Sequence, residues 1–324
     1  MKRRDMIAAG LAFGPAASLL AAPAIAQQPY PNRPIRVIVP IAAGGGTDIL
    51  IRMIAPKAAT LLGAPLIIDN RAGAEGTIGT EILVRAPADG YTLLFSDSSL
   101  YLNKVTRANM PFDPMTDILP VARAAVGSLI LFGSPAFGVR DLTGLIARSK
   151  ADPRSVSYGT GSTGAYLLGE LLKMRTGIEM EHVPYRGGAL AVTDTISGHI
   201  SMTFNGASIG KPFVLSGELL GIGSTGDRRN PALPDIVTFG EQGFPGFPAG
   251  SEWGLFAPKG MPAGITGQVH AAFREALFDP AIASRLAELG FTPDGTDGAT
   301  YLADKAKEMQ LWVEVAASAG LVAR

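Results

Sequence analysis

The sequence predicts an α/β protein made of two units, each a mostly parallel sheet flanked by helices. Its 324 residues exceed what one hydrophobic core usually organises. A composition that is 47% hydrophobic and 17% charged is typical of a folded chain and unlike that of a disordered one. Short apolar runs alternate with amphipathic stretches in two series, before and after residues 112–132, and this alternation indicates parallel βαβ units.

The expected strands are short apolar runs rich in β-branched or aromatic residues, and the expected helices are the amphipathic stretches between them. In the first series, strands are predicted at 35–40, 65–70 and 91–96, with helices at 49–63 and 80–86. In the second series, strands are predicted at 156–161, 178–185, 200–206 and 219–225, with helices at 141–150, 165–177 and 189–198. A strand at 253–258 and helices at 265–278, 280–290 and from 300 onward complete the chain.

Because a strand and helices return after the second series, the C-terminal part is expected to complete the first unit. This predicts a discontinuous first lobe at 27–127 and 252–324, a second lobe at 128–251, and a hinged cleft between them. In the last helix, apolar residues that step by four and three positions predict the packing face. They are Leu302, Ala306, Met309, Val313 and Ala316.

Residues 1–26 have the three parts of a secretory signal peptide: a basic start (MKRRDM), a small apolar stretch, and the A-x-A cleavage site Ala24-Ile25-Ala26. The pair Arg3-Arg4 leaves a twin-arginine export route open beside the ordinary one. We therefore expect a periplasmic protein that begins at Gln27 after cleavage. The sequence has no cysteine and hence no disulfide, and its 28 basic and 28 acidic residues give no charge excess that would indicate nucleic acid binding.

Two glycine-rich loops, AAGGGTD at 42–48 and GTGSTG at 159–164, each join a predicted strand to a predicted helix. Glycines let the backbone fold tightly and expose its N–H groups, and a helix N-terminus adds a partial positive charge. Each loop therefore predicts a site for a small anion that needs no Lys or Arg. Asp48, at the end of the first loop, is expected either to cap the helix or to face the ligand.

Two enzymatic alternatives stay open at this point. GTGSTG fits the dinucleotide fingerprint G-x-G-x-x-G, but the acids Glu179 and Glu181 lie at the start and middle of the next strand, whereas a ribose-binding acid belongs at its end. GASIG at 206–210 fits the nucleophile elbow G-x-S-x-G, which would make an exported serine hydrolase using Ser208. The other members of the catalytic triad would then be Asp227 or Asp235, and His270. The three histidines are not spaced as metal ligands, so no metal site is expected.

Several segments, taken together and in order, resemble the substrate-binding proteins of tripartite tricarboxylate transporters, the Bug family. They include YPNRPIRVIVPIAAGGGTD, IIDNRAGAEGTIGT, ADGYTLLFS, HVPYRGG, LPDIVTFGEQGFPGF and WGLFAPKGMP, and they span nearly the whole mature chain. The resemblance implies the two-lobed, class II periplasmic-binding-protein fold. It also implies that the protein is no enzyme, uses no cofactor, and binds a small carboxylate for membrane permease subunits. We further expect a monomer.

The resemblance also implies a set of ligand-binding residues in both lobes. They are Ile41, Ala42, Ala43, Gly44, Gly45, Gly46, Thr47, Asp48, Ser98, Ser99, Thr160, Gly161, Ser162, Thr163, Tyr185 and Asn205. Tyr185 is alternatively a packing residue and Asn205 a turn residue, and Arg186 is expected to face solvent. The sequence departs from the family pattern at Ile41, Tyr166 and Leu190, where relatives usually have an aromatic residue, His and Pro, so it does not define which carboxylate is bound.

Overall fold

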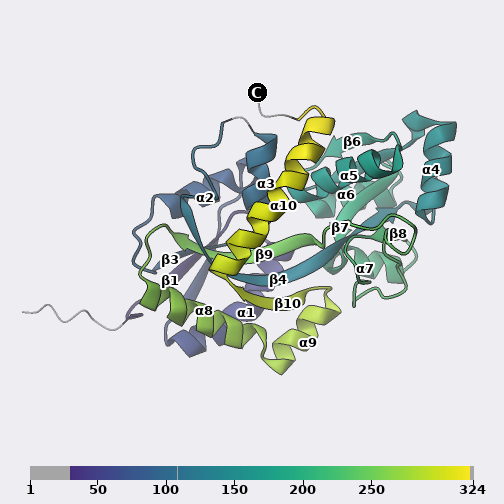
Figure 1. The fold of residues 1–324 in the computed structure, drawn as a ribbon. Coiled ribbons are helices and arrows are strands. Elements are labelled where there is room, and N and C mark those ends of the chain that lie inside the picture. Colours follow the sequence, from purple (N-terminus) through teal and green to yellow (C-terminus); the bar gives the residue numbers. More distant parts are fainter. Residues whose placement is uncertain (1–29, 108, 322–324) are drawn as a thin grey trace, which may run out of the picture. The chain divides into compact units, whose positions relative to one another are not determined.

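We describe a computed structural model of the chain at residues 30–107 and 109–321; the predicted signal peptide lies outside these residues. The described strands form one sheet, in which eight neighbouring strands follow the order β2-β1-β3-β9-β4-β7-β5-β6 (Figure 1). Its first part contains β1 (Ile35–Val39), β2 (Leu66–Asn70) and β3 (Thr92–Asp97), with β2 and β3 paired in parallel to β1, and β9 (Gly250–Pro258) antiparallel to β3. Its second part contains β5 (Ser157–Thr160), β6 (Glu181–Pro184) and β7 (Met202–Gly206), with β6 and β7 parallel to β5.

The strand β4 (Ile118–Gly133) links the two parts of the sheet. It pairs with β9 as far as Ser128, and with β7 from Leu129 onward. Two further strands pair with it in antiparallel fashion, β10 (Thr292–Asp297) along its first half and β8 (Leu220–Ser224) near its end. The change of partner between Ser128 and Leu129 is next to the predicted lobe boundary, although the division into lobes itself stays a prediction.

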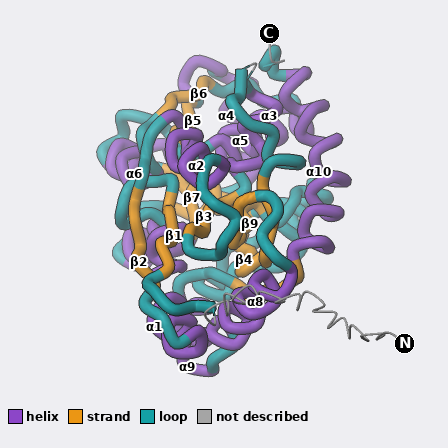
Figure 2. Tube along the Cα trace, turned by 90° about the vertical axis from the view of Figure 1, so that its left-hand side faces the viewer, coloured by secondary structure: helices purple, strands orange, loops and turns teal. Residues whose placement is uncertain are grey.

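The helices cover both faces of the strands (Figure 2). They are α1 (Gly46–Leu62), α2 (Thr77–Val84), α3 (Ser99–Thr106), α4 (Leu142–Ala151), α5 (Thr163–Thr176), α6 (Gly188–Ile196), α7 (Ala207–Leu215), α8 (Ala263–Leu277), α9 (Pro280–Glu288) and α10 (Gly298–Ser318). Local sequence explains their ends: α1 stops at Gly63, whose positive φ of 74° lets its N–H reach the carbonyls of Ala59 and Thr60. No described helix is long and apolar enough to span a membrane.

The predicted strands and helices are present, and the packing face predicted for the last helix is confirmed in part, because Leu302, Met309 and Ala316 pack into the core. Ala306 is exposed and Val313 is 52% exposed, whereas Tyr301, Lys305 and Trp312 are at most 2% exposed. The buried face thus combines part of the predicted stripe with residues directly beside it on the helix. Sequence hydrophobicity alone does not place Lys305 on this face, because Lys305 is a charged residue whose ammonium group is paired inside the protein.

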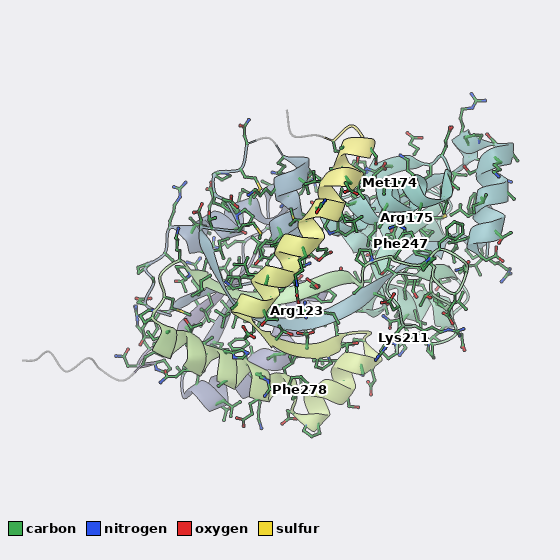
Figure 3. All side chains as sticks on the ribbon, viewed as in Figure 1. Arg123, Met174, Arg175, Lys211, Phe247 and Phe278 are labelled. Atoms are coloured by element: carbon green, nitrogen blue, oxygen red, sulfur yellow. The ribbon has the colours of Figure 1, made fainter. Side chains whose placement is uncertain are left out.

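The two ends of α10 pack into different hydrophobic clusters. Near its start, Tyr301 packs with Tyr101 of α3 and Phe256 of β9, at ring distances of about 6 Å. Near its end, Trp312 and Val315 join the cluster that α5 and β7 build. The helix crosses β4, where the side chain of Arg123 is labelled in Figure 3. It therefore connects the two parts of the sheet on the outside, as β4 does within the sheet.

Candidate ligand-binding site

A cavity of about 590 Å³ lies where loops of the first and second parts of the sheet meet. Its lining comes mostly from segments that follow the carboxyl ends of parallel strands, because these ends meet along one edge of a sheet and ligands bind there. Most of the residues predicted for the site line it: Ile41, Ala42, Ala43, Gly44, Gly45, Gly46, Thr47, Ser99, Gly161, Ser162, Thr163 and Asn205.

Six helices begin at this cavity, namely α1, α2, α3, α5, α6 and α7. In four of them, α1, α2, α6 and α7, the N-cap residue is a glycine and no side chain caps the first turn; these glycines are Gly45, Gly76, Gly187 and Gly206. Of the helices that begin elsewhere, α4, α9 and α10 are capped by aspartate side chains, whereas α8, which follows Pro262, has no side-chain cap. At the cavity, no side chain caps the first turn of these four helices, and the positive ends of six helix dipoles converge there.

Four of the predicted residues, Asp48, Ser98, Thr160 and Tyr185, lie outside the cavity lining and support it. Ser98 Oγ accepts a hydrogen bond from the backbone N–H of Glu252 at 3.2 Å. Thr160 Oγ1 lies 2.7 Å from His182 Nε2, and the Tyr185 hydroxyl donates to the Asp194 carboxylate at 2.7 Å. For these residues the structure shows packing roles, and direct ligand contact by them stays a prediction.

Asp48 holds the first glycine-rich loop in shape. It is buried; one carboxylate oxygen accepts the N–H of Gly44 at 2.9 Å, and the other accepts from Arg52 and Asn70, both at 2.9 Å. Burial alone would raise the pKa of this carboxyl, but the hydrogen bonds from Arg52, Gly44 and Asn70 outweigh burial and lower its pKa below 3.8. Asp48 therefore organises the loop before α1 and does not cap the first turn of the helix, and its other predicted role, contact with the ligand, stays a prediction.

The charge of Asp48 is expected to stabilise the folded protein above its unfolded pKa of 3.8, and this contribution disappears as the pH falls through the lower folded pKa. Asp48→Asn should therefore lower the free energy of unfolding at pH 7 by about 1–3 kcal/mol. The difference from wild type should shrink below pH 3.8. Urea unfolding at pH 7 and pH 3 measures both, with the exposed Asp227→Asn as control. An equal difference at both pH values would contradict this role.

The GTGSTG loop is held close to the neighbouring HVPYRGG segment. A Cβ atom added at Gly161 would lie 2.3 Å from Gly187 C and from Gly188 N. A Cβ at Gly188 would lie 2.0 Å from Asn205 Oδ1, and the Asn205 amide donates to the Gly188 carbonyl at 3.2 Å. Gly161 is therefore required where backbone meets backbone. At Gly159 a Cβ would meet the side chain of Ile200 at 2.5 Å, whereas Gly164 has room for a Cβ, so packing accounts for two of the three fingerprint glycines.

The geometry gives the two enzymatic alternatives no support. Glu181 is exposed at the first residue of β6, far from the carboxyl end where a ribose-binding acid would lie. Ser208 lines the cavity, but His270 Nε2 lies 3.3 Å from the Gly295 carbonyl, and no hydrogen bond joins Ser208 to a histidine in the described part of the chain. The described residues also contain no group of His, Asp and Glu side chains arranged to hold a metal ion.

Several lining residues were not predicted, among them Glu75, Thr77, Asp97, Asn103 and Trp253. Some share a turn in which two non-glycine residues, Ala74 and Glu75, have positive φ values of 46° and 53°. Asn103 holds this turn by donating to the Glu75 carbonyl at 2.9 Å, and it accepts from Thr163 Oγ1 at 2.6 Å. The only sequence signal for the turn was the glycine-rich run at 71–79.

Arg186 was expected to face solvent, and the structure places it both in the cavity lining and on the surface. No acidic side chain pairs with its guanidinium among the described residues. It is therefore an exposed cation at the edge of a cavity that is otherwise surrounded by helix N-termini.

The architecture, two βαβ series joined through β4 with a cavity at the strand ends, is that of a two-lobed periplasmic binding protein, which confirms the predicted fold class. A solved structure of R. palustris Rpa4515 with adipate superimposes with a TM-score of 0.85 at 30% identity, covering 91% of this chain and 100% of the other. MatC from Rhodopseudomonas palustris with bound malate gives 0.81 at 27% identity, covering 88% and 99%.

The chain belongs to the tripartite tricarboxylate transporter receptor family, whose model matches residues 50–317. The Bug protein BugT of Bordetella pertussis is 34% identical over 310 residues, which cover 93% of each chain. Members of this family are solute-binding proteins, so the family resemblance found in the sequence is confirmed. These relatives give no support to a hydrolase or an oxidoreductase.

Proposed function

We propose that this chain captures a small carboxylate in its cavity and is not an enzyme. The observation that carries the proposal is the convergence of helix N-termini with glycine N-caps on one cavity. Backbone N–H groups and helix dipoles bind an anion without a full counter-charge, and Arg186 adds one cation at the edge. The adipate and malate in the two solved neighbours are carboxylates, which supports this choice of ligand class.

The mechanism follows from the position of the cavity between the two parts of the sheet. The ligand enters from the open side, the loops after β1 and β5 hold it, and the predicted lobes close about the hinge strands β4 and β9. The hydrogen bond of 2.6 Å from Thr163, at the start of α5, to Asn103 of α3 joins the two parts and supports such closure. The loaded, exported protein then delivers its ligand, as a monomer in the periplasm, to the membrane subunits of a tripartite transporter.

Carboxylate binding is expected to stabilise the protein that begins at Gln27. At about 100 times the dissociation constant, a ligand that binds only the folded state adds about 2.7 kcal/mol, so its presence raises the midpoint of thermal unfolding. Adipate and malate are the first ligands to test by thermal unfolding and titration calorimetry. The matched control for adipate is 1,6-hexanediol, which keeps the carbon chain and lacks the charges. A flat response to every carboxylate in such a panel would refute the proposal.

A further inference from the structure

Three acidic side chains, Asp48, Glu75 and Asp97, lie at or directly behind the cavity lining, and they differ in whether an arginine pairs with them. Asp48 is paired with Arg52 at 2.9 Å, and Glu75 with Arg107 at 3.0 Å. Asp97 lines the cavity and has no ion pair with any described residue. The protein thus neutralises two of these acids with its own arginines and leaves the third without a cationic partner.

The hydrogen bonds of Asp97 leave one of its carboxylate oxygens largely unused. Asp97 is the last residue of β3, and its Oδ1 accepts the N–H of Ser99 at the start of α3, at 2.9 Å. Its Oδ2 is reached by a long contact of 3.5 Å from Thr47 Oγ1, and the Ser99 hydroxyl is a further hydrogen-bond donor to the carboxylate. The Thr47 hydroxyl is itself fixed, because it accepts the indole N–H of Trp253 at 3.1 Å. Oδ2 therefore has room to accept a further hydrogen bond from inside the cavity.

An unpaired acid in a cavity for anions is unfavourable unless the ligand itself provides a partner. A ligand carboxylate close to Asp97 would meet a like charge, and burial without a cation raises the pKa of the Asp97 carboxyl. A hydroxyl or ammonium group on the ligand removes the difficulty, since it donates to Oδ2 and completes the hydrogen bonding of the carboxylate.

We propose that Asp97 is a specificity-determining residue that accepts a hydrogen bond from a hydroxyl or ammonium group of the ligand. The preferred ligand is then a carboxylate that also carries such a donor, rather than a plain dicarboxylate. This inference rests on the proposed function, because it concerns the same cavity. The ligand then needs a hydrogen-bond donor for Asp97 in addition to the negative charge that the helix N-termini bind.

The test compares ligands of equal carbon skeleton with and without the donor: succinate, malate and aspartate. Because hydrogen bonds to charged groups contribute about 1.5–3 kcal/mol, the donor-bearing ligand should bind about 10- to 100-fold more tightly to the wild-type protein in titration calorimetry. Malate and aspartate distinguish a hydroxyl from an ammonium donor. Equal affinity for all three would overturn the inference while leaving carboxylate binding intact; no binding of any carboxylate would overturn both.

The variant Asp97→Asn tests the residue itself, because its amide oxygen still accepts the Ser99 N–H while the charge is lost. The preference for the donor-bearing ligand over succinate should fall by about tenfold or more, with succinate affinity unchanged or higher. Glu241→Gln is the control, because Glu241 lies outside the cavity lining and pairs with Arg229 at 2.8 Å, and its preference should stay at the wild-type value. Equal weakening of succinate and malate by Asp97→Asn would contradict a role in specificity. If Asp97→Asn does not fold, the affinities of the wild-type protein for succinate, malate and aspartate still test the proposal.

Discussion

Gly161→Ala is expected to weaken carboxylate binding about 10- to 100-fold. The new Cβ would lie 2.3 Å from two backbone atoms of Gly187 and Gly188, which cannot rotate out of the way as a side chain does. The GTGSTG loop and the HVPYRGG segment must then separate, which displaces the starts of α5 and α6 at the cavity. Overpacking of this kind costs about 1–3 kcal/mol, and a similar loss of binding free energy gives the expected change in Kd.

Gly187→Ala is the matched control for this substitution, since a Cβ there meets nothing within 4 Å and the residue has an extended φ of 176°. Titration calorimetry compares the dissociation constants of the two variants. The ligand is malate or adipate, whichever binds the wild-type protein. Wild-type affinity in Gly161→Ala would show that the close approach of the two segments is not needed for the site.

Lys305→Ala is expected to reduce the free energy of unfolding by about 3–5 kcal/mol. Lys305 on α10 is 2% exposed, and its ammonium group pairs with Glu252 of β9 and with Glu308. Arg123 of β4 extends the network to Asp294 of β10 at 3.1 Å. Removing the ammonium leaves a carboxylate of the network buried without its partner, which costs more than the pair contributes when it is complete.

Urea unfolding measures this loss, and Lys307→Ala is the control because Lys307 is exposed two residues further along the same helix. The double variant with Glu252→Gln and Lys305→Met should recover part of the stability, since it removes the charge on both sides of one buried pair. A loss below about 1 kcal/mol for Lys305→Ala would mean that the network contributes no more than a surface ion pair.

The sequence was sufficient for the elements whose pattern is local. Local sequence alone predicts the strands at the centres of both βαβ series. It also predicts the glycine loops at 42–48 and 159–164, without reference to the segments that pack against them. β10 was missed because TPDGTD contains Pro293 and Gly295 and is a strand only through its pairing with β4. α3 and α7 were also missed, and α7 contains Pro212, a residue that is unfavourable inside a helix.

The site was predictable to the extent that single loops build it. Glycine-rich loops after strands indicated where an anion would lie, and most of the residues named from them line the cavity. Asp97, Asn103 and Trp253 were not predictable, because their roles depend on contacts between distant segments such as the hydrogen bond from Trp253 to Thr47. The supporting role of Asp48 is likewise decided by Asn70, which only the fold brings near it.

The central claim is that uncapped helix N-termini hold a carboxylate in the cavity. The most direct test is to follow backbone amide resonances by ¹H–¹⁵N correlation spectroscopy while malate or adipate is added. The account predicts the largest shifts at the amides of Gly46, Thr47, Gly188 and Ala207, in the first turns of α1, α6 and α7, all saturating with one dissociation constant. Saturable shifts confined to residues outside the cavity, such as Glu170 and Lys173, with these amides unmoved, would contradict it.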